Sequence, residues 1–408
     1  MTSDKTAEIV IIGAGVSGLC CARRLVEAGR KPIILEASDG IGGRVRTDLV
    51  EGFRLDRGFQ VLLTAYPEAR AVLDYDALDL RPFAPGALVR SAGRFERVSD
   101  PWRQPSRLWS TLRARVGTLG DKLRLAKLRR AVRKGLGDET TTLEALRGFG
   151  FSSRMIDTLF RPWFGGVFLD PSLSASSTAF AYSFRMFSSG RTALPAEGMG
   201  AIPIQLAARL PEGTIRLETG VEAIDGQRLR LDGGEWIETP NIVIATEAPQ
   251  MSRLLGEAPP PPGRGVRTLH FAADTPPVRE PILVLNGDGQ GPVNDLCVVS
   301  QVAPSYASNG RSLVSVTVLD EAAESETELT AAVCAQLGEW FGEAVADWRH
   351  LRTLRISHAL PAQAPGRLRG DGPALRPGLY VCGDHREASS LQGAMLSGRR
   401  AAEAVLQI

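Results

Sequence analysis

The stretch IVIIGAGVSG at residues 9–18 decides the fold, because it joins a short apolar run to three glycines in the spacing GxGxxG. Residues 9–12 are typical of a buried strand, and a helical pattern follows over about 16–28. Gly29 stands just past that pattern, where a glycine often ends a helix. A second apolar run at 33–35 completes a β-α-β unit, which implies a parallel sheet with a right-handed crossover.

This unit carries the features of a dinucleotide site. Gly13 permits a tight turn, Gly15 lets the backbone approach a pyrophosphate, and Gly18 lets the helix pack closely on the strand. Glu36 ends the second strand, where a carboxylate can accept hydrogen bonds from a ribose. The glycine spacing by itself also fits a structural turn, so the strand, the helix and the acid carry the prediction. The predicted contacts are Gly13, Gly15, Val16, Ser17, Gly18, Glu36 and Ala37.

A second glycine motif follows directly, in the sequence GIGGRVRT at residues 40–47. Gly42, Gly43 and Arg44 lie close enough to the first site to contact the same cofactor. Two glycines and a guanidinium suit a diphosphate approached from its other side. The alternative is a glycine loop that carries a solvated arginine.

The chain ends in VCGDHREASSLQGAMLSG at residues 381–398. Together with Gly13–Gly18, Glu36 and the motif at 42–44, this tail resembles the flavin-containing amine oxidase superfamily. That group includes monoamine oxidases, protoporphyrinogen oxidase, and phytoene desaturases with their carotenoid-isomerase relatives. The resemblance implies a non-covalent FAD, with Asp384 near the ribityl–pyrophosphate region. It also implies a helix beginning near Gly393 that aims its N-terminus at the flavin N1–C2=O edge, where reduced flavin carries negative charge.

Further cofactor contacts follow from the same resemblance by position. Val221 matches a valine that bonds the adenine through its backbone, and Ala245-Thr246 matches a loop near the adenine side. The segment Gly58-Phe59-Gln60-Val61 corresponds to the one that passes the isoalloxazine ring, although Phe59 and Val61 fit core packing equally well. The implied contacts are Gly42, Gly43, Arg44, Gly58, Phe59, Gln60, Val61, Val221, Ala245, Thr246, Gly383, Asp384, Leu391, Gln392, Gly393 and Ala394.

The substrate side departs from the amine oxidases. Many of them carry a lysine near flavin N5, but the last lysine of this chain is Lys134. The expected zone offers Arg267 and His270 instead, and arginine stays charged and cannot act as a base. The departure favours the desaturase, isomerase and porphyrinogen-oxidase relatives, with a hydrophobic small molecule as substrate. A flavin amine oxidase and a non-enzymatic escort protein of the same fold remain the alternatives.

Aromatic residues cluster in the segments expected to surround that substrate. Trp163, Phe164 and Phe184 come from a ring-rich stretch at 161–187, and Tyr306 comes from a later one. We expect these four to border an apolar cavity over the flavin, although ordinary core packing fits any single ring. No residue stands out as a catalytic acid or base.

Composition sets the remaining expectations. Of 408 residues, 43% are apolar and 23% are charged, and the net charge of +2 gives no indication of nucleic-acid binding. We expect an α/β fold with a discontinuous Rossmann-type FAD-binding domain (1–75, 192–248 and 371–408) and an inserted mixed α/β substrate domain (76–191 and 249–370). Five scattered cysteines, four histidines without ligand spacing and a polar N-terminus predict a cytoplasmic protein without a metal.

One segment stands out by charge. Residues 100–134 hold eleven Arg and Lys against two Asp, with leucines in between. Such a stretch can lie on an anionic membrane surface as a peripheral contact, or it can be a solvated helix over the core. The sequence leaves both open, and it does not indicate an oligomeric state.

Overall fold

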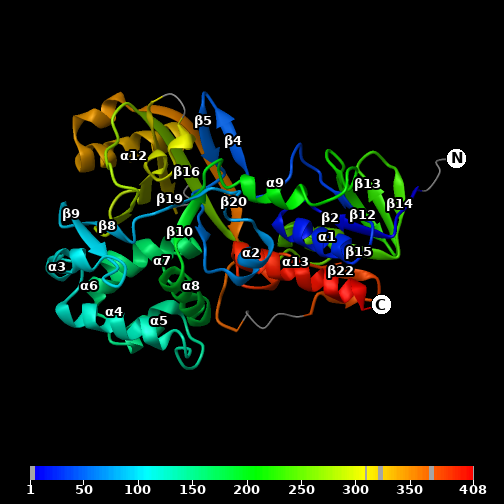
Figure 1. The fold of residues 1–408 in the computed structure, drawn as a ribbon, viewed down its shortest axis with the longest axis horizontal. Coiled ribbons are helices and arrows are strands. Elements are labelled where there is room, and N and C mark those ends of the chain that lie inside the picture. Colours follow the sequence, from blue (N-terminus) through cyan, green and yellow to red (C-terminus); the bar gives the residue numbers. More distant parts are fainter. Residues whose placement is uncertain (1–4, 308–309, 320–324, 367–371, 408) are drawn as a thin grey trace.

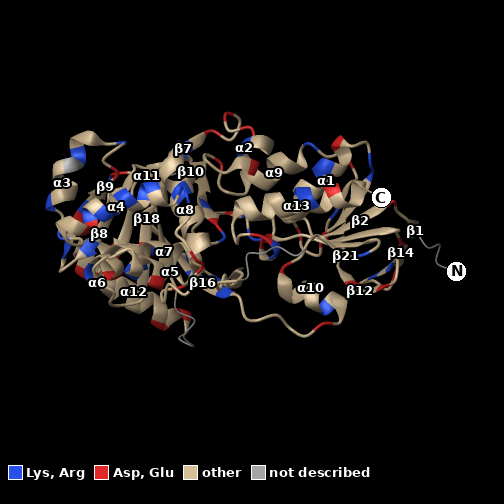
Figure 2. Cartoon of the chain, turned by 90° about the horizontal axis from the view of Figure 1, so that it is seen from below, with Lys and Arg blue, Asp and Glu red and all other residues tan. Residues whose placement is uncertain are grey.

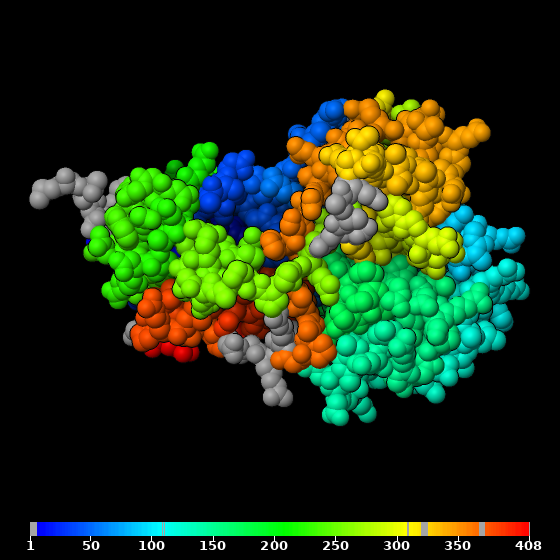
Figure 3. All heavy atoms as spheres, turned by 180° about the vertical axis from the view of Figure 1, so that it is seen from behind, coloured from blue at the N-terminus to red at the C-terminus, as the bar shows by residue number. Residues whose placement is uncertain are grey.

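The computed structural model describes residues 5–307, 310–319, 325–366 and 372–407. Figure 1 shows an elongated molecule of two lobes, and both ends of the described chain lie on the same lobe. Figure 3 shows the lobes from behind, with segments from distant parts of the sequence packed together in each.

The first lobe is built around a six-stranded sheet in the order β11-β3-β2-β15-β22-β21. Its first five strands run parallel and β21 pairs antiparallel at the edge. Helix α1 joins β2 to β3, and α13 packs along α1. The bounds are β2 Ile9–Ile12, α1 Val16–Glu27, β3 Pro32–Leu35, β11 Ile215–Arg216, β15 Asn241–Ile244, β21 Ala374–Arg376, β22 Leu379–Val381 and α13 Leu391–Leu406.

A smaller sheet in the order β1-β14-β13-β12 covers the other side of this lobe. Its apolar side chains pack on those of β2, β15 and β22, so the parallel sheet is buried on both faces, as parallel sheets usually are. The bounds are β1 Lys5–Thr6, β12 Val221–Asp225, β13 Arg228–Leu231, β14 Trp236–Glu238 and α10 Ala248–Leu255.

The second lobe holds a seven-stranded sheet in the order β20-β16-β19-β18-β17-β8-β9. Neighbouring strands are antiparallel except β8 and β17, which are parallel. Helix α12 packs on one face and α7 with α8 on the other. The bounds are β8 Gly86–Ser91, β9 Arg94–Ser99, α7 Arg161–Phe168, α8 Ser177–Ser189, β16 Arg264–Ala273, β17 Leu283–Asn286, β18 Val293–Val298, β19 Ser312–Val318, α12 Glu326–Phe341 and β20 Arg349–Leu360.

Shorter elements connect the lobes and flank the second one. A hairpin of β4 and β5 and a small sheet in the order β6-β10-β7 complete the fold. Helices α3 to α6 extend from the second lobe (Figure 1). The bounds are β4 Thr47–Val50, β5 Phe53–Asp56, β6 Leu62–Leu63, α2 Pro67–Val72, β7 Leu80–Pro82, α3 Leu108–Arg113, α4 Leu119–Ala131, α5 Thr142–Gly148, α6 Ser153–Met155, β10 Thr192–Pro195, α9 Ala201–Ala207 and α11 Val299–Val302.

The α/β class and the Rossmann-type unit predicted from the sequence are confirmed. Within 76–190, β8 and β9 complete the large sheet beside the helices α3 to α8. The last helix begins at Leu391, close to the expected start near Gly393, and the Ser390 side chain caps it by accepting a hydrogen bond from the Gly393 N–H. Among the described residues, no helix has the length and apolarity needed to cross a bilayer.

Candidate cofactor and substrate site

One large cavity of about 1630 Å³ runs from the first lobe into the second. Its first part lies at the carboxyl ends of β2, β3 and β15, the edge of a parallel sheet where ligands usually bind. Its second part is walled by α7, α8 and the large sheet. The cavity therefore joins the two motif-rich regions of the sequence in one space.

The two glycine loops meet at the first part of the cavity. Gly15 forms an isolated parallel bridge with Gly42, and the Gly42 N–H donates to the Ala14 carbonyl over 2.8 Å. A Cβ on Gly15 would find no atom within 4 Å, so the missing side chain leaves open space. The first N–H groups of an α-helix have no intrahelical acceptor, and at α1 the residue before the helix, Gly15, has no side chain to cap them. This is a cradle for an anionic group.

Gly18 and Gly393 serve packing. A Cβ on Gly18 would lie 2.1 Å from the Gly13 carbonyl oxygen, and one on Gly393 would lie 1.8 Å from the Ala388 carbonyl oxygen. Neither glycine lines the cavity. Each lets a neighbouring loop pass close to the start of a helix, which holds the helix N-terminus at the cavity wall.

Glu36 holds the first loop in shape. Its Oε2 accepts a hydrogen bond from the Ala14 N–H over 2.7 Å, and its Oε1 accepts from the Ser38 N–H over 2.9 Å. The carboxylate is half-buried and lines the cavity beside Ala37. Its remaining lone pairs are available to a ribose hydroxyl.

Arg44 reaches the C-terminal motif across 340 residues of sequence. Its guanidinium donates to Asp384 Oδ1 over 2.6 Å and to the Ala359 carbonyl over 2.7 Å. Asp384 is 5% exposed, and both residues line the cavity. The arginine contributes positive charge at the glycine loops, as a diphosphate requires, while the aspartate holds it in place.

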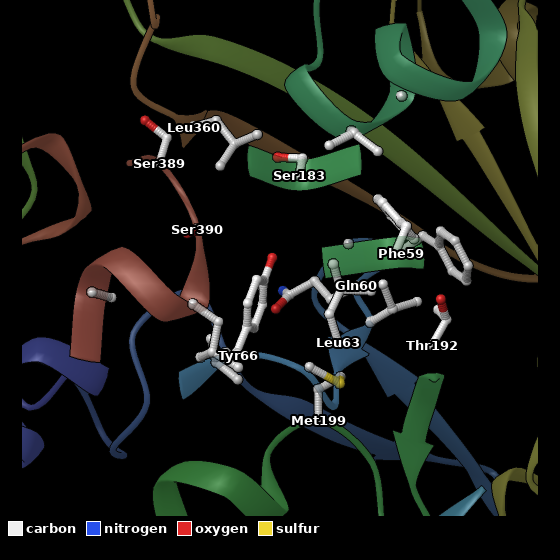
Figure 4. A pocket seen from close by; sticks show the side chains of 18 of the residues that line it. Phe59, Gln60, Leu63, Tyr66, Ser183, Thr192, Met199, Leu360, Ser389 and Ser390 are labelled. Atoms are coloured by element: carbon white, nitrogen blue, oxygen red, sulfur yellow. The ribbon is translucent and has the colours of Figure 1, made fainter. Parts of the chain in front are cut away.

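The segment 58–66 passes between the two parts of the cavity. Figure 4 shows Gln60, Leu63 and Tyr66 lying next to one another, facing Ser390 at the start of α13. The Gln60 side-chain amide donates to the Arg44 carbonyl over 2.8 Å, which ties this segment to the glycine loop. Phe59 lines the cavity and packs edge-on against Phe83 at a centroid distance of 6.3 Å.

The wall in the second lobe is largely apolar. Trp163 and Phe184 line it, with ring centroids 6.0 Å apart, and Leu283 and Leu285 face them from β17. Phe187 packs on Trp163 at 5.5 Å and also lines the cavity. This surface suits a hydrophobic molecule.

Two of the four aromatic residues expected in this wall lie elsewhere. Phe164 is fully buried among Phe160, Phe168 and Phe180, because it sits on the face of α7 that turns into the aromatic core. The hydroxyl of Tyr306 donates to Asp56 over 2.7 Å, and the ring is 1% exposed. Neither residue lines the cavity.

The structure brings most of the cofactor residues predicted from the sequence to the cavity wall. Gln392 lies off it, because its Oε1 accepts a hydrogen bond from the Glu68 N–H. Gly18 and Gly393 lie just behind it. The predicted residues that line the cavity are Gly13, Gly15, Val16, Ser17, Glu36, Ala37, Gly42, Gly43, Arg44, Gly58, Phe59, Gln60, Val61, Val221, Ala245, Thr246, Gly383, Asp384, Leu391 and Ala394.

Two histidines near the site are held neutral. Burial lowers the pKa of His385 to about 4, and it lowers the pKa of His270 to about 4 as well. Neither imidazole lines the cavity. The His385 ring packs beside the Gly383 backbone, where a Cβ would lie 2.4 Å from the ring.

Sequence reasoning missed several residues of the wall. Asp295 on β18 and Thr317 on β19 line the second part of the cavity, and both are nearly buried. Each lies in a segment whose pattern of residues predicts a strand, but that pattern does not show which parts of the molecule the two faces of the strand contact. Tyr66 was also missed; it lines the cavity and stands directly before the proline that starts α2.

The residues present fit FAD. The space beside Gly15, the uncapped first turn of α1 and the Arg44 guanidinium suit the diphosphate, and Glu36 suits a ribose. Leu391 at the start of α13 and the segment 58–66 line the cavity close to each other, and they would hold the flavin ring of a bound FAD.

Comparisons with known proteins agree with this reading. The family model for flavin-containing amine oxidoreductases matches residues 16–406. Hydroxysqualene dehydroxylase of Rhodopseudomonas palustris is 27% identical over 97% of each chain. A 15-cis-phytoene desaturase of Narcissus pseudonarcissus is 30% identical over 38% of this chain and 30% of its own length. The match to the curated phytoene desaturases thus spans less than a third of their length.

Solved structures agree on the fold. A protoporphyrinogen oxidase-like protein of Exiguobacterium sp. 255-15 superposes with a TM-score of 0.76 over 100% of both chains, at 20% identity. The family model covers nearly the whole chain, from the first helix of the Rossmann unit to the C-terminal helix. The chain therefore belongs to the flavin-containing amine oxidoreductase family, and it is an FAD-dependent oxidoreductase.

Proposed function

We propose that the chain catalyses two-electron oxidation, desaturation or flavin-assisted isomerisation of a hydrophobic small molecule. The observation that carries this proposal is the apolar wall formed by Trp163, Phe184, Phe187, Leu283 and Leu285 in direct continuity with the cofactor cleft. FAD, when bound, supplies the electron acceptor, with hydride arriving at flavin N5. The protein's task is then to orient the substrate and exclude water.

The relatives support a hydrophobic substrate by their names. Phytoene and hydroxysqualene, named in two of them, are long and mostly hydrocarbon. The match to hydroxysqualene dehydroxylase spans 97% of both chains, whereas the match to a putrescine oxidase of Kocuria rosea spans 16% of this one. The extended match supports a lipid-like substrate over a small amine.

The titratable groups of the site support the same choice. No lysine is among the described residues that line the cavity. His270, from the zone where amine oxidases carry a lysine, is 2% exposed and lies behind the wall. Simple primary amines should therefore be poor substrates.

The test is anaerobic mixing of the FAD-loaded protein with a polyene, a porphyrinogen, benzylamine and putrescine, while the flavin absorbance is followed. We expect a polyene or a related isoprenoid to bleach the flavin and the amines to leave it oxidised. Rapid bleaching by an amine, with none by the hydrophobic compounds, would contradict the proposal and favour the amine-oxidase alternative. A protein that never takes up FAD would favour the escort alternative.

We also propose that residues 100–134 dock on an anionic membrane surface, from which such a substrate could enter. Exposed apolar side chains gather there: Trp102, Trp109, Leu119 and Leu123 are 52–70% exposed. Along α4, Leu119 and Leu123 share a stripe with Lys127, since all three are spaced four residues apart. Figure 2 shows basic residues gathered around α3 and α4. Apolar and cationic groups on one surface suit an interfacial contact.

The cavity reaches this region. Trp102, Arg103, Leu125 and Arg129 are among its lining residues. Arg129 itself belongs to the fold, because it pairs with Asp100 over 3.0 Å and its guanidinium lies 4.5 Å from the centre of the Trp102 ring. A docked membrane would therefore lie beside one end of the cavity.

Co-sedimentation with vesicles tests the docking. The protein should bind phosphatidylserine-containing vesicles at 0.01 M salt and less at 0.15 M, where the Debye length falls from about 30 Å to about 8 Å. K127E/R130E/R133E should abolish binding, because all three side chains are exposed, while the matched control R209E/R279E/R376E, three exposed arginines outside 100–134, should not. If the native protein also fails to bind the vesicles, the docking proposal is wrong and α4 is a solvated helix over the core.

A further inference from the structure

A row of polar side chains crosses the face of the large sheet that is turned toward the cavity. Asp295 on β18 is the direct neighbour of Thr317 on β19, and Thr317 is the direct neighbour of Thr268 on β16. Directly opposed residues of antiparallel strands project from the same face. Asp295 and Thr317 line the cavity, and Thr268 continues the row behind its wall.

These side chains are buried yet incompletely paired. Asp295 is 5% exposed, Thr317 is 4% exposed and Thr268 is fully buried. Within the described part of the chain, Asp295 Oδ1 and the two threonine Oγ1 atoms form no hydrogen bond of normal geometry, and the Thr317 hydroxyl lies only near enough to the Asp295 carboxyl to lower its pKa. Most buried polar atoms in folded proteins have a partner. Two such atoms side by side at a cavity wall, on Asp295 and Thr317, indicate a ligand that supplies the missing partners.

The other oxygen of Asp295 is fixed by the protein. Its Oδ2 accepts from the Asn294 side-chain amide over 2.8 Å, and the same amide donates to the Pro162 carbonyl over 3.0 Å. Gly166 leaves room for this pair, because a Cβ there would lie 2.9 Å from Asn294 Nδ2. The carboxyl is therefore held in one orientation, with Oδ1 left over.

The surroundings of the row are apolar. Leu285 is the direct neighbour of Asp295 on β17, and both line the cavity with Trp163. Burial raises the pKa of the Asp295 carboxyl to about 6, while the Asn294 amide and the Thr317 hydroxyl act in the opposite direction. A single polar group inside an apolar chamber fixes the orientation of a ligand that is otherwise hydrophobic.

We propose that Asp295 and Thr317 bind a hydroxyl group on the hydrophobic substrate and so decide which part of that molecule meets the flavin. This inference rests on the proposed function and narrows its substrate class to an oxygenated hydrocarbon. A hydroxyl donates one hydrogen bond, which Asp295 Oδ1 accepts, and its lone pairs accept one from Thr317. Both unpaired atoms at the wall are thereby satisfied.

Other ligand classes fit the row less well. A pure hydrocarbon would leave the carboxylate oxygen and the threonine hydroxyl buried without partners. An ammonium offers donors only, so it could pair with the carboxylate but would give the Thr317 hydroxyl hydrogen no acceptor. The hydroxyl is the smallest group that meets both demands.

Matched ligands test the inference on the FAD-loaded protein. Farnesol, farnesene and farnesylamine share one isoprenoid chain and differ in the terminal group. Their binding is measured by the change that each causes in the flavin absorption spectrum. We expect farnesol to bind about 10- to 100-fold more tightly than farnesene, the range for a hydrogen bond to a charged partner. We expect farnesylamine to bind more weakly than farnesol.

Substitutions test whether Asp295 and Thr317 cause the difference in affinity between farnesol and farnesene. D295L and T317V each replace the native residue by one of similar shape. They should bring the ratio of the farnesene Kd to the farnesol Kd down toward one, without weakening the binding of farnesene. D295N gives a second variant in case D295L does not fold. S315A is the control, since Ser315 is a buried hydroxyl two residues from Thr317 on the same strand but does not line the cavity. It should keep the full preference.

The outcomes separate this inference from the proposed function. Equal binding of farnesol and farnesene, or a preference that survives in D295L, D295N and T317V, would overturn the role of the row while leaving a hydrophobic substrate in place. Tighter binding of farnesylamine would overturn the choice of a hydroxyl. A flavin spectrum that no isoprenoid perturbs would overturn the proposed function together with the inference.

Discussion

Glu36→Ala should weaken FAD binding by roughly 1–3 kcal/mol, because the variant loses the carboxylate that is placed to accept from a ribose hydroxyl. That range corresponds to a rise in Kd of roughly 5- to 150-fold. The same carboxylate accepts from the Ala14 and Ser38 N–H groups over 2.7 and 2.9 Å. The apo-protein should therefore lose stability as well, toward the lower end of about 1–3 kcal/mol, since the side chain is half-buried and water replaces part of what is lost.

The assay is titration of apo-protein with FAD, followed by flavin fluorescence, with thermal unfolding measured in parallel. Glu36→Gln keeps the shape and one acceptor oxygen, so it should fall between the native protein and Glu36→Ala. Glu247→Ala is the matched control. Glu247 is an exposed carboxylate that also lines the cavity, and its side chain does not cap the helix that follows it. A Kd for Glu36→Ala within twofold of the native value, or an equal loss in Glu247→Ala, would refute the reasoning.

Three further predictions concern the cavity wall, a buried histidine and a helix contact. Phe184→Ala should change substrate affinity while FAD stays bound, whereas Phe180→Ala, which removes a ring that does not line the cavity, should lower Tm without changing affinity. The pKa of His270 is lowered from 6.5 to about 4, so the unfolded chain binds the proton more readily, and stability should fall by about 2 kcal/mol between pH 7 and pH 5. His270→Gln should remove that part of the pH dependence of unfolding. Gly398→Val should destabilise the fold by about 1–3 kcal/mol in chemical denaturation, because its Cβ would lie 2.2 Å from the Ser17 carbonyl oxygen.

The cofactor half of the molecule follows closely from the sequence, because its signals are local. The unit at 9–36 contains its strands, turn, helix and acid within a short stretch, so the pattern specifies both the fold and the site. Local signals also mark helix starts: Ser325 and Glu328 form the capping box that begins α12 at Glu326. Ser390 caps the last helix, which begins at Leu391, close to the start expected near Gly393.

The substrate half follows poorly, because its geometry depends on contacts between distant residues. β8 pairs with β17 almost 200 residues later, and no local pattern announces that partner. The burial of Tyr306 depends on a hydrogen bond to Asp56, 250 residues away. A ring on α7 faces either the cavity or the core according to its position around the helix, and composition predicts neither.

The most direct test of the central claim is to identify and count the flavin in the purified protein. The protein is denatured, the precipitate is removed, and the flavin in the supernatant is separated by chromatography and quantified against the chain. The cleft described here predicts one FAD per chain, all of it released, because the contacts of Gly15, Glu36 and Arg44 suit a whole dinucleotide held without a covalent bond. A colourless protein that takes up no added FAD, or one that carries FMN instead, would contradict the account.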